Sequence, residues 1–353
     1  MNARQIAIGG RQVGFGHRPF VIAEVGINHD GDMKKALEMI RVAKEAGADA
    51  VKFQTFKASE FVGDPQQLFT YRSQGAEVTE SMLMMFQRYE LPRDGWREIK
   101  AECLRRDIIF LSTPQNRSDL ELLIEVGIPA IKIGSDDFTN LPLIRSYCES
   151  GLPLILSCGM ADLAEVHQAL EAAGSPRGYP VALLLCTSQY PTPPRDVNLR
   201  KLTTLQATFP SLVVGFSDHT QGPLAASLAR ALGAALFEKH FTLDQGAPGP
   251  DHWFSEDPQG LARWVASIRT ADVMLGSDQV RPTDAELDMR RIARRSLVAL
   301  AAISKGDLLT VNNVGARRPG YGLPPSLLEQ VLGAAATRDI AAGEVLKLED
   351  VLK

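Results

Sequence analysis

The fold is decided by one stretch near the N-terminus, residues 20–55, which reads FVIAEVGINHDGDMKKALEMIRVAKEAGADAVKFQT. Apolar runs open and close it, Phe20 to Val25 and Ala50 to Gln54, and both are short enough to predict strands. Between them, from Met33 to Ala46, apolar residues recur on one helical stripe and charged residues occupy the other side. The stretch therefore predicts two parallel strands, because parallel strands need a crossover helix to join them.

The same alternation continues to about Leu275. Six further apolar runs follow, each with a polar or glycine-rich break and a helical stretch behind it: Ile108 to Leu111, Ala130 to Ile133, Leu154 to Leu156, Val181 to Leu185, Leu212 to Phe216 and Ala235 to Glu238. Eight strand-and-helix units are typical of a (β/α)8 TIM barrel. A doubly wound open sheet is the alternative, but residues 25–31, VGINHDG, are not the G-x-G-x-x-G motif that such a sheet would carry.

Composition narrows the function classes. The chain has 353 residues, a net charge of −4 and no block of like charges, so it shows no electrostatic footprint for nucleic acid or anionic lipid. Its apolar runs are too short to span a bilayer, and the N-terminal stretch is not a signal peptide. Four scattered cysteines fit a reducing compartment. We expect a cytoplasmic protein that acts on small molecules, with no nucleic-acid or membrane partner.

The pattern changes after the predicted barrel, which we place at residues 1–276. Residues 277–292 form a polar linker, and residues 293–353 form a compact tail with its own repeat. In that repeat, ISKGDLL at 303–309 recurs as IAAGEVL at 340–346, a shift of 37 residues. Each copy consists of an apolar residue, a glycine turn and an apolar pair. Two such copies predict a small β-rich domain with internal pseudo-symmetry.

Polar side chains close nearly every predicted barrel strand. In a parallel barrel the reactive groups lie at the C-terminal ends of the strands, and alternate residues share one face. The predicted inward set is Glu24, Lys52, Gln54, Thr113, Lys132, Ser135, Asp137, Ser157, Ser188, Tyr190, Ser217, His219, Glu238 and His240. The sequence thus predicts one polar site at the C-terminal mouth of the barrel.

Two lysines of this set, Lys52 and Lys132, are flanked by apolar residues. A buried ammonium group is costly unless it meets a negative partner. A buried Lys–Glu pair would explain one such lysine. Two lysines, with serines at other strand ends to donate hydrogen bonds, favour a bound phosphate or a phosphate plus a carboxylate.

Two histidines, His219 and His240, end consecutive predicted strands. This arrangement suits a two-imidazole metal site with open positions, for Zn²⁺ or for Mn²⁺- and Mg²⁺-like ions. Hydrogen-bonded core histidines or a general acid are the alternatives. Acid–base candidates are the carboxylates of Glu24, Asp137 and Asp251, with Glu238 as a further one.

Eight motifs in order carry a resemblance to a known family: IAEVGINH (22–29), VKFQT (51–55), STP (112–114), KIGS (132–135), YPT (190–192), GFSDHT (215–220), EKHFT (238–242) and GPDH (249–252). Together they resemble the sialic acid synthase (N-acetylneuraminate synthase) family over nearly the whole chain. The tail, from Arg294 through Gly320, resembles the antifreeze-like (SAF, β-clip) domain of that family. The resemblance implies a TIM barrel followed by a SAF domain.

The resemblance also implies an activity. Members condense phosphoenolpyruvate with the open-chain form of an N-acetylated amino sugar, cleave the C–O bond of phosphoenolpyruvate and release phosphate. The implied reaction here is that of a metal-dependent transferase of polysaccharide biosynthesis, most simply the conversion of N-acetylmannosamine to N-acetylneuraminate.

Roles for single residues follow from the same resemblance. It implies that Lys52, Thr113, Lys132, Ser135, Ser157, Ser188 and Ser217 hold phosphoenolpyruvate, and that Glu24, Gln54, Tyr190 and Asp251 hold the sugar. His219 and His240 would bind Mn²⁺, with Mg²⁺ or Co²⁺ as alternatives, and Asp137 would handle protons. Members form homodimers in which the tail covers the partner's barrel, so Arg318 would reach the sugar across the interface.

Some residues depart from the family pattern and leave the acceptor sugar open. Asp136 and Asp137 stand where many members carry Gly or Phe and then Glu, and Cys158, Leu185 and Gln189 are also unusual. The acceptor could then be N-acetylmannosamine, its 6-phosphate, or a diamino sugar that leads to legionaminic or pseudaminic acid. A metal-dependent aldolase or hydrolase, and a catalytically silent sugar-binding protein of polysaccharide biosynthesis, are the alternative functions.

Overall fold

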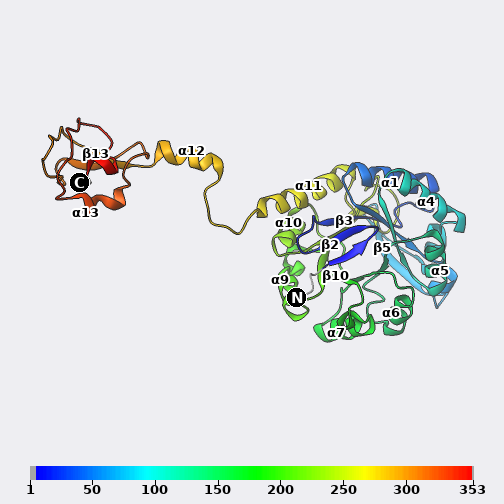
Figure 1. The fold of residues 1–353 in the computed structure, drawn as a ribbon. Coiled ribbons are helices and arrows are strands. Elements are labelled where there is room, and N and C mark those ends of the chain that lie inside the picture. Colours follow the sequence, from blue (N-terminus) through cyan, green and yellow to red (C-terminus); the bar gives the residue numbers. More distant parts are fainter. Residues whose placement is uncertain (1–4, 352–353) are drawn as a thin grey trace. The chain divides into compact units, whose positions relative to one another are not determined.

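The computed structural model describes residues 5–351, which belong to two compact units, Met1–Gly276 and Ser277–Lys353 (Figure 1). The first unit is a closed barrel of eight parallel strands in the order β10-β11-β12-β3-β4-β7-β8-β9. The strands are β3 (Phe20–Gly26), β4 (Ala50–Thr55), β7 (Ile109–Pro114), β8 (Ile131–Ile133), β9 (Leu154–Ser157), β10 (Val181–Cys186), β11 (Val213–Ser217) and β12 (Leu236–His240). The predicted barrel is confirmed, and every strand but β8 runs one to three residues further than predicted.

Helices cover the outside of the barrel (Figure 1). They are α1 (Met33–Glu45), α4 (Arg93–Arg105), α5 (Arg117–Val126), α6 (Leu141–Cys148), α7 (Leu163–Ala172), α9 (Arg200–Thr208), α10 (Leu224–Ala231) and α11 (Pro258–Leu275). Helix α1 shows why these segments form helices that pack on the barrel. Asp32 caps α1 by accepting from Lys34 N at 2.7 Å, and Met39 and Ile40 are fully buried on its inner face. The outward-facing strand residues and these helical stripes form the main core.

A short hairpin that the sequence analysis did not predict closes the N-terminal end of the barrel. Its strands are β1 (Gln5–Ile8) and β2 (Arg11–Gly14), paired antiparallel. Ile8 and Val13 are fully buried in one cluster with inward-facing residues near the strand starts, among them Ile22 and Leu111. The barrel is therefore filled at this end, and its C-terminal end is left for a site.

A second hairpin follows β4 and the short helix α2 (Ala58–Phe61). It consists of β5 (Leu68–Ser73) and β6 (Ala76–Ser81) and leads into α3 (Met82–Tyr89). Ile27, Phe56, Met85 and Tyr89 form a small buried cluster, against which apolar residues of the hairpin pack. This insertion lies between the second barrel strand and α4 in the chain, so it belongs to the C-terminal face of the barrel.

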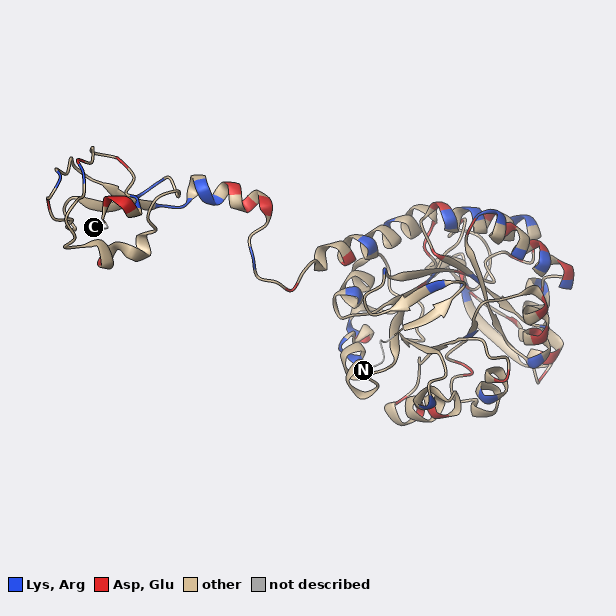
Figure 2. Ribbon diagram, in the orientation of Figure 1, with Lys and Arg blue, Asp and Glu red and all other residues tan. Residues whose placement is uncertain are grey.

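The second unit begins with α12 (Asp284–Ala293), which carries acidic residues in its first turn and arginines in its last (Figure 2). That polarity complements the helix dipole. The unit continues with β13 (Ser296–Ala299), β14 (Val314–Arg317) and α13 (Leu328–Val331), around its own apolar core. The two copies of the repeat pair directly, because Ile303 N donates to Ile340 O at 2.9 Å and Ile340 N donates to Ile303 O at 2.8 Å.

Two further properties of residues 5–351 bear on the composition analysis. None of the helices in this range is both long and apolar enough to cross a membrane. All four cysteines are free.

Candidate active site

A cavity of about 650 Å³ opens at the C-terminal end of the barrel. All but one of the predicted barrel residues line it: Glu24, Lys52, Gln54, Thr113, Lys132, Ser135, Ser157, Ser188, Tyr190, Ser217, His219, Glu238, His240 and Asp251. All of them but Asp251 lie within a barrel strand or within four residues of its end, and Asp251 comes from the loop behind β12. The structure therefore brings these residues together at one cavity, and their roles stay predictions.

Asp137 is the exception, and its neighbour Asp136 lines the cavity instead. The Asp137 carboxylate accepts from Asn140 Nδ2 at 3.0 Å, in the turn before α6. Strand alternation itself favours Asp136, because Asp136 and not Asp137 is an even number of residues from the inward-facing Lys132. Arg318 belongs to the second unit, and its role stays a prediction.

Buried charges cluster on the floor of the cavity. Lys52 Nζ lies 2.9 Å from Glu24 Oε1 and 3.7 Å from Glu238 Oε2, and Lys132 Nζ lies 3.9 Å from Glu238 Oε1. All four side chains are at most 6% exposed. The lysines are thus paired with glutamates and also line the cavity, and the bound anion stays a prediction.

The pKa shifts of these four side chains show which of them stay ionised near neutral pH. Burial would raise the pKa of Glu238, but the charges of Lys132 and Lys52 outweigh it and lower the pKa to about 2. Burial would lower the pKa of Lys52, but the charges of Glu238 and Glu24 raise it. For Lys132 burial dominates and lowers the pKa, and for Glu24 burial raises it to about 7. Glu238 is thus ionised and lies between two lysines, and this arrangement suits the cavity floor to binding a further anion.

Serine hydroxyls at the ends of β8, β9 and β10 line the cavity together with Lys132. Its Nζ donates to Ser157 Oγ at 2.7 Å, and Gly159 N donates to Ser135 Oγ at 3.0 Å. A side chain at position 159 would collide with the hydroxyls of Ser188 and Ser135, so glycine is needed for the two to converge there. The Lys132 ammonium group and the hydroxyls of Ser135, Ser157 and Ser188, which all line the cavity, form what we call the anion cradle. Sequence analysis missed Gly159, because no motif marks it.

The two predicted histidines lie beside each other, with ring centroids 5.6 Å apart. His219 Nδ1 donates to the Thr187 carbonyl at 2.8 Å, so Nε2 is the ring atom left to bind a metal. Burial would lower the pKa of His219, but the Cys186 thiol and the Thr187 carbonyl raise it, so a metal at Nε2 would displace a proton. Nδ1 of His240 is buried without a hydrogen-bond partner, 3.8 Å from Asp251 Oδ2. The pKa of His240 is lowered well below its usual value, first by burial and then by the charges of His219 and Lys52, so this ring stays neutral.

These features fit a metal held by two imidazoles. Within residues 5–351 no group of three or more His, Cys, Asp or Glu side chains could hold an ion by itself. The pair would therefore need further ligands from water or substrate, which is the open geometry of a catalytic site.

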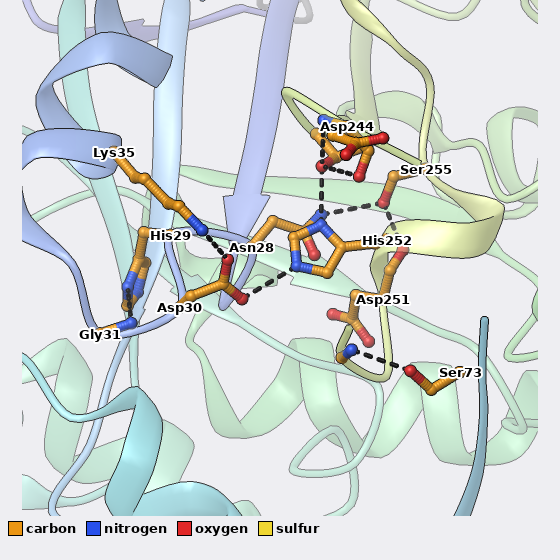
Figure 3. A network of polar contacts seen from close by, with 12 residues as sticks. Asn28, His29, Asp30, Gly31, Lys35, Ser73, Asp244, Asp251, His252 and Ser255 are labelled. Carbon is orange, nitrogen blue, oxygen red and sulfur yellow. Dashed lines mark hydrogen bonds and ion pairs between the residues drawn. The ribbon is translucent and has the colours of Figure 1, made fainter. Parts of the chain in front are cut away.

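A polar network fixes the loop that carries Asp251 (Figure 3). His252 Nε2 lies 2.9 Å from Asp30 Oδ1, and His252 Nδ1 lies 2.7 Å from Thr242 Oγ1. Ser255 Oγ donates to the Asp251 carbonyl at 2.6 Å. The loops behind β3 and β12 are thereby joined, which holds Asp251 at the cavity, where burial raises its pKa to about 6. Sequence analysis had assigned His252 no role.

Several further lining residues were not predicted. Most come from loops, from the β5–β6 hairpin or from the short helices α2 and α3, and Cys186 ends β10: Ile27, Phe61, Phe69, Thr70, Tyr71, Arg72, Met85, Phe86, Gln115, Met160, Cys186, Trp253 and Phe254. The signal that could have found some of them is the aromatic alternation of Phe69 and Tyr71 in a stretch between two barrel strands.

Fold and site define a (β/α)8 barrel protein with an anion cradle and an imidazole pair at its catalytic face. Comparison with known proteins identifies the family. The NeuB family profile matches residues 39–280, and the SAF domain profile matches residues 294–352. The chain belongs to the NeuB family.

Individual relatives agree with this assignment. The N,N'-diacetyllegionaminic acid synthase of Legionella pneumophila is 38% identical over 336 residues, 94% of each chain. The human N-acetylneuraminate-9-phosphate synthase is 34% identical and covers 92% of this chain and 90% of its own. A crystal structure of N-acetylneuraminic acid synthetase from Leptospira borgpetersenii superposes with a TM-score of 0.73 at 31% identity, covering 81% of this chain and 95% of the other.

Proposed function

We propose that the protein condenses phosphoenolpyruvate with the open-chain form of an N-acetylated amino sugar and releases phosphate by C–O cleavage. The family resemblance of the sequence favours N-acetylmannosamine as the simplest acceptor and N-acetylneuraminate as the product. The observation that carries the proposal is the pair of buried lysines that share Glu238 beside the serine cradle. The names of the relatives support the reaction class.

Phosphoenolpyruvate carries a phosphate and a carboxylate, and the cavity floor offers two cationic positions. Lys132 with Ser135, Ser157 and Ser188 would bind one anionic group, and Lys52 with Thr113 would bind the other. Ser217 donates to Glu238 Oε1 at 2.9 Å and keeps that carboxylate in place between the lysines. Fixing both ends of the small molecule removes most of its rotational freedom before the acceptor arrives.

A divalent metal would be held by His219 and His240, with Mn²⁺ as the first candidate and Mg²⁺ or Co²⁺ as alternatives. When bound there, it would supply Lewis-acid polarisation of the acceptor's aldehyde oxygen. The neutral state of His240 and the Nδ1 hydrogen bond of His219, which leaves Nε2 as its ligand atom, are the features that support this role.

Proton transfer is assigned to carboxylates. Glu24, with a pKa of about 7, can both take and give a proton near neutral pH. We assign the proton-handling role to Asp136 in place of Asp137, because Asp136 lines the cavity in which water must attack the carbon that was C2 of phosphoenolpyruvate. Gln54, Tyr190 and Asp251 would hold the hydroxyl and amide groups of the sugar.

We also propose a cytoplasmic homodimer in which the SAF domain covers the partner's barrel and Arg318 completes the sugar site. The barrel lining contains three Lys or Arg side chains, Lys52, Arg72 and Lys132, and the first and last of these are engaged with glutamates. A guanidinium supplied by the tail would add a donor for the sugar.

The proposal is tested by following inorganic phosphate release from phosphoenolpyruvate with Mn²⁺ and one acceptor at a time. Sugar-dependent release, matched by formation of a 2-keto acid, is the expected result. Activity that does not need phosphoenolpyruvate would indicate an aldolase or hydrolase. Tight sugar binding by a folded, metal-loaded protein without phosphate release from any acceptor would indicate the silent sugar-binding protein.

A further inference from the structure

The outward face of β11 and β12 changes in character at the level of the imidazole pair. Phe216 and Phe237 are buried in the main core between the strands and the helices. Two residues further along, the same face carries Asp218 and Lys239, which are 1% and 2% exposed and do not line the cavity. Each of these charged residues directly precedes one histidine of the imidazole pair. Buried charge thus begins on the outer face where the two histidines begin on the inner one.

The ammonium group of Lys239 meets three acceptors, one for each of its N–H donors. It donates to the Thr220 carbonyl at 2.5 Å, and it lies 3.3 Å from Asp218 Oδ2 and 3.7 Å from Glu256 Oε1. Asp218 and Thr220 are the residues on either side of His219 in the chain. One ammonium group on β12 thus holds both neighbours of His219.

The carboxylate of Asp218 is also fully engaged. Its Oδ1 accepts from Thr220 N at 2.8 Å and from Thr220 Oγ1 at 2.7 Å, and its Oδ2 accepts from Trp264 Nε1 at 2.8 Å. Trp264 belongs to α11 and is fully buried. The turn that begins at Asp218 is therefore fixed against a packed helix, and so is the direction in which His219 leaves it.

Glu256 extends the same network to the second histidine. Its Oε1 accepts from Gly222 N at 3.0 Å, and its backbone N donates to the His240 carbonyl at 3.0 Å. We call Asp218, Lys239 and Glu256 the outer charge network. Through it, the chain segments that carry the two histidines are joined on the side of the barrel wall away from the cavity.

The fold by itself does not call for buried charge here. Apolar residues of similar volume often stabilise a protein as well as a buried ion pair does, or better. The preceding outward positions, Phe216 and Phe237, are apolar. What the outer charge network adds is direction, because hydrogen bonds hold atoms at set distances and angles. A metal held by two imidazoles depends on their spacing, and loss of an outer hydrogen-bonding partner typically weakens metal binding about 10–100-fold.

We propose, on the basis of the proposed function, that Lys239 is a positioning residue for the metal site. Through both neighbours of His219 and through Glu256 it sets the spacing of the imidazole pair, so that both rings are in place before the metal arrives. Lys239 itself touches neither metal nor substrate and acts through the histidines.

Calorimetric titration of the metal-free protein with Mn²⁺ tests this without requiring turnover. Lys239→Met should bind Mn²⁺ about 10–100-fold more weakly than the parent protein. Lys239→Arg keeps the charge and the donors and should recover most of the affinity. With Co²⁺ in the site, the visible absorption spectrum should shift in Lys239→Met, because it reports the arrangement of the ligands. At saturating metal, the KM of phosphoenolpyruvate should be unchanged.

Asp49→Asn is the matched control for loss of a buried charge. Asp49 is 5% exposed, lies 2.5 Å from Arg11 and 2.6 Å from Arg269, and directly precedes β4, at the end of the barrel opposite the cavity. This variant should be less stable than the parent protein and bind Mn²⁺ with unchanged affinity. If Lys239→Met does not fold, Asp218→Asn serves the same comparison, because it removes the charge that faces the ammonium group.

The outcomes distinguish the two proposals. Unchanged Mn²⁺ affinity in the folded Lys239→Met or Asp218→Asn variant overturns the inference, since the outer charge network would then serve the fold alone. A parent protein that binds no metal overturns it as well, together with the metal role in the proposed function. Weakened metal binding in the variant, beside a parent protein that binds metal but turns over no acceptor, supports the inference and contradicts the proposed function alone.

Discussion

The Lys132→Met variant distinguishes two roles for Lys132: binding an anionic substrate, and stabilising the fold through its ion pair with Glu238. Lys132 is 2% exposed and lies 3.9 Å from Glu238, while its ammonium donates to Ser157 and to the Ile133 carbonyl. At an effective dielectric constant of about 20, the attraction to Glu238 is about 4 kcal/mol. Removing a buried cation also removes a desolvation penalty of several kcal/mol. Because burial lowers the pKa of Lys132, the penalty outweighs the attraction.

The variant should therefore unfold with a free energy within about 1 kcal/mol of the parent protein, or above it, because methionine fills a similar volume. Its affinity for phosphoenolpyruvate should fall about 100-fold, since a buried charge-assisted contact is lost. Urea unfolding without ligand gives the first quantity, and calorimetric titration with phosphoenolpyruvate gives the second. A loss of about 3–5 kcal/mol in unfolding free energy would refute the reasoning, as would unchanged affinity.

Lys239→Met is the matched control. Lys239 is also 2% exposed, bonds to the Thr220 carbonyl and lies 3.3 Å from Asp218 and 3.7 Å from Glu256, but it does not line the cavity. Its loss leaves two carboxylates without their cation, so we expect about 3–5 kcal/mol of destabilisation and unchanged affinity for phosphoenolpyruvate in the folded fraction.

Three further predictions follow from the same structure. His219→Ala or His240→Ala should abolish metal-dependent turnover and leave the unfolding transition cooperative; turnover retained by either variant would remove the metal assignment. Burial lowers the pKa of His29 to about 4 from 6.5, so the unfolded chain binds more protons between these values, and stability should fall by up to about 3 kcal/mol as pH drops from 6.5 to 4. Urea unfolding at several pH values checks this, and His29→Gln should flatten the dependence. Removal of the chain after Gly276 should leave a folded barrel without turnover if Arg318 completes the site; a fully active barrel would assign the tail another role.

The barrel and most of its site could be predicted because both follow from local patterns. Strand length and helical periodicity define the eight units, and strand alternation directs side chains such as Lys52 and His240 inward. Asp137 was assigned from the family resemblance, whereas alternation from Lys132 places Asp136 on the inward face, and Asp136 lines the cavity.

The loops could not be predicted in the same way. The position of the β5–β6 hairpin depends on distant hydrogen bonds, such as that between Gly249 and Ser73. The convergence of hydroxyls at Gly159 depends on three strand ends meeting in space. Neither feature leaves a local pattern in the sequence, so the position of the hairpin and the anion cradle required the structure.

The central claim is that the protein cleaves the C–O bond of phosphoenolpyruvate while joining its methylene carbon to a sugar aldehyde. Phosphoenolpyruvate labelled with ¹⁸O at the bridging oxygen tests this directly, with N-acetylmannosamine or a diamino sugar as acceptor and mass spectrometry of the released phosphate. The account predicts that the label leaves in the phosphate, in equal amount to the 2-keto acid formed. Label retained in the keto acid, or phosphate released without sugar, would contradict it.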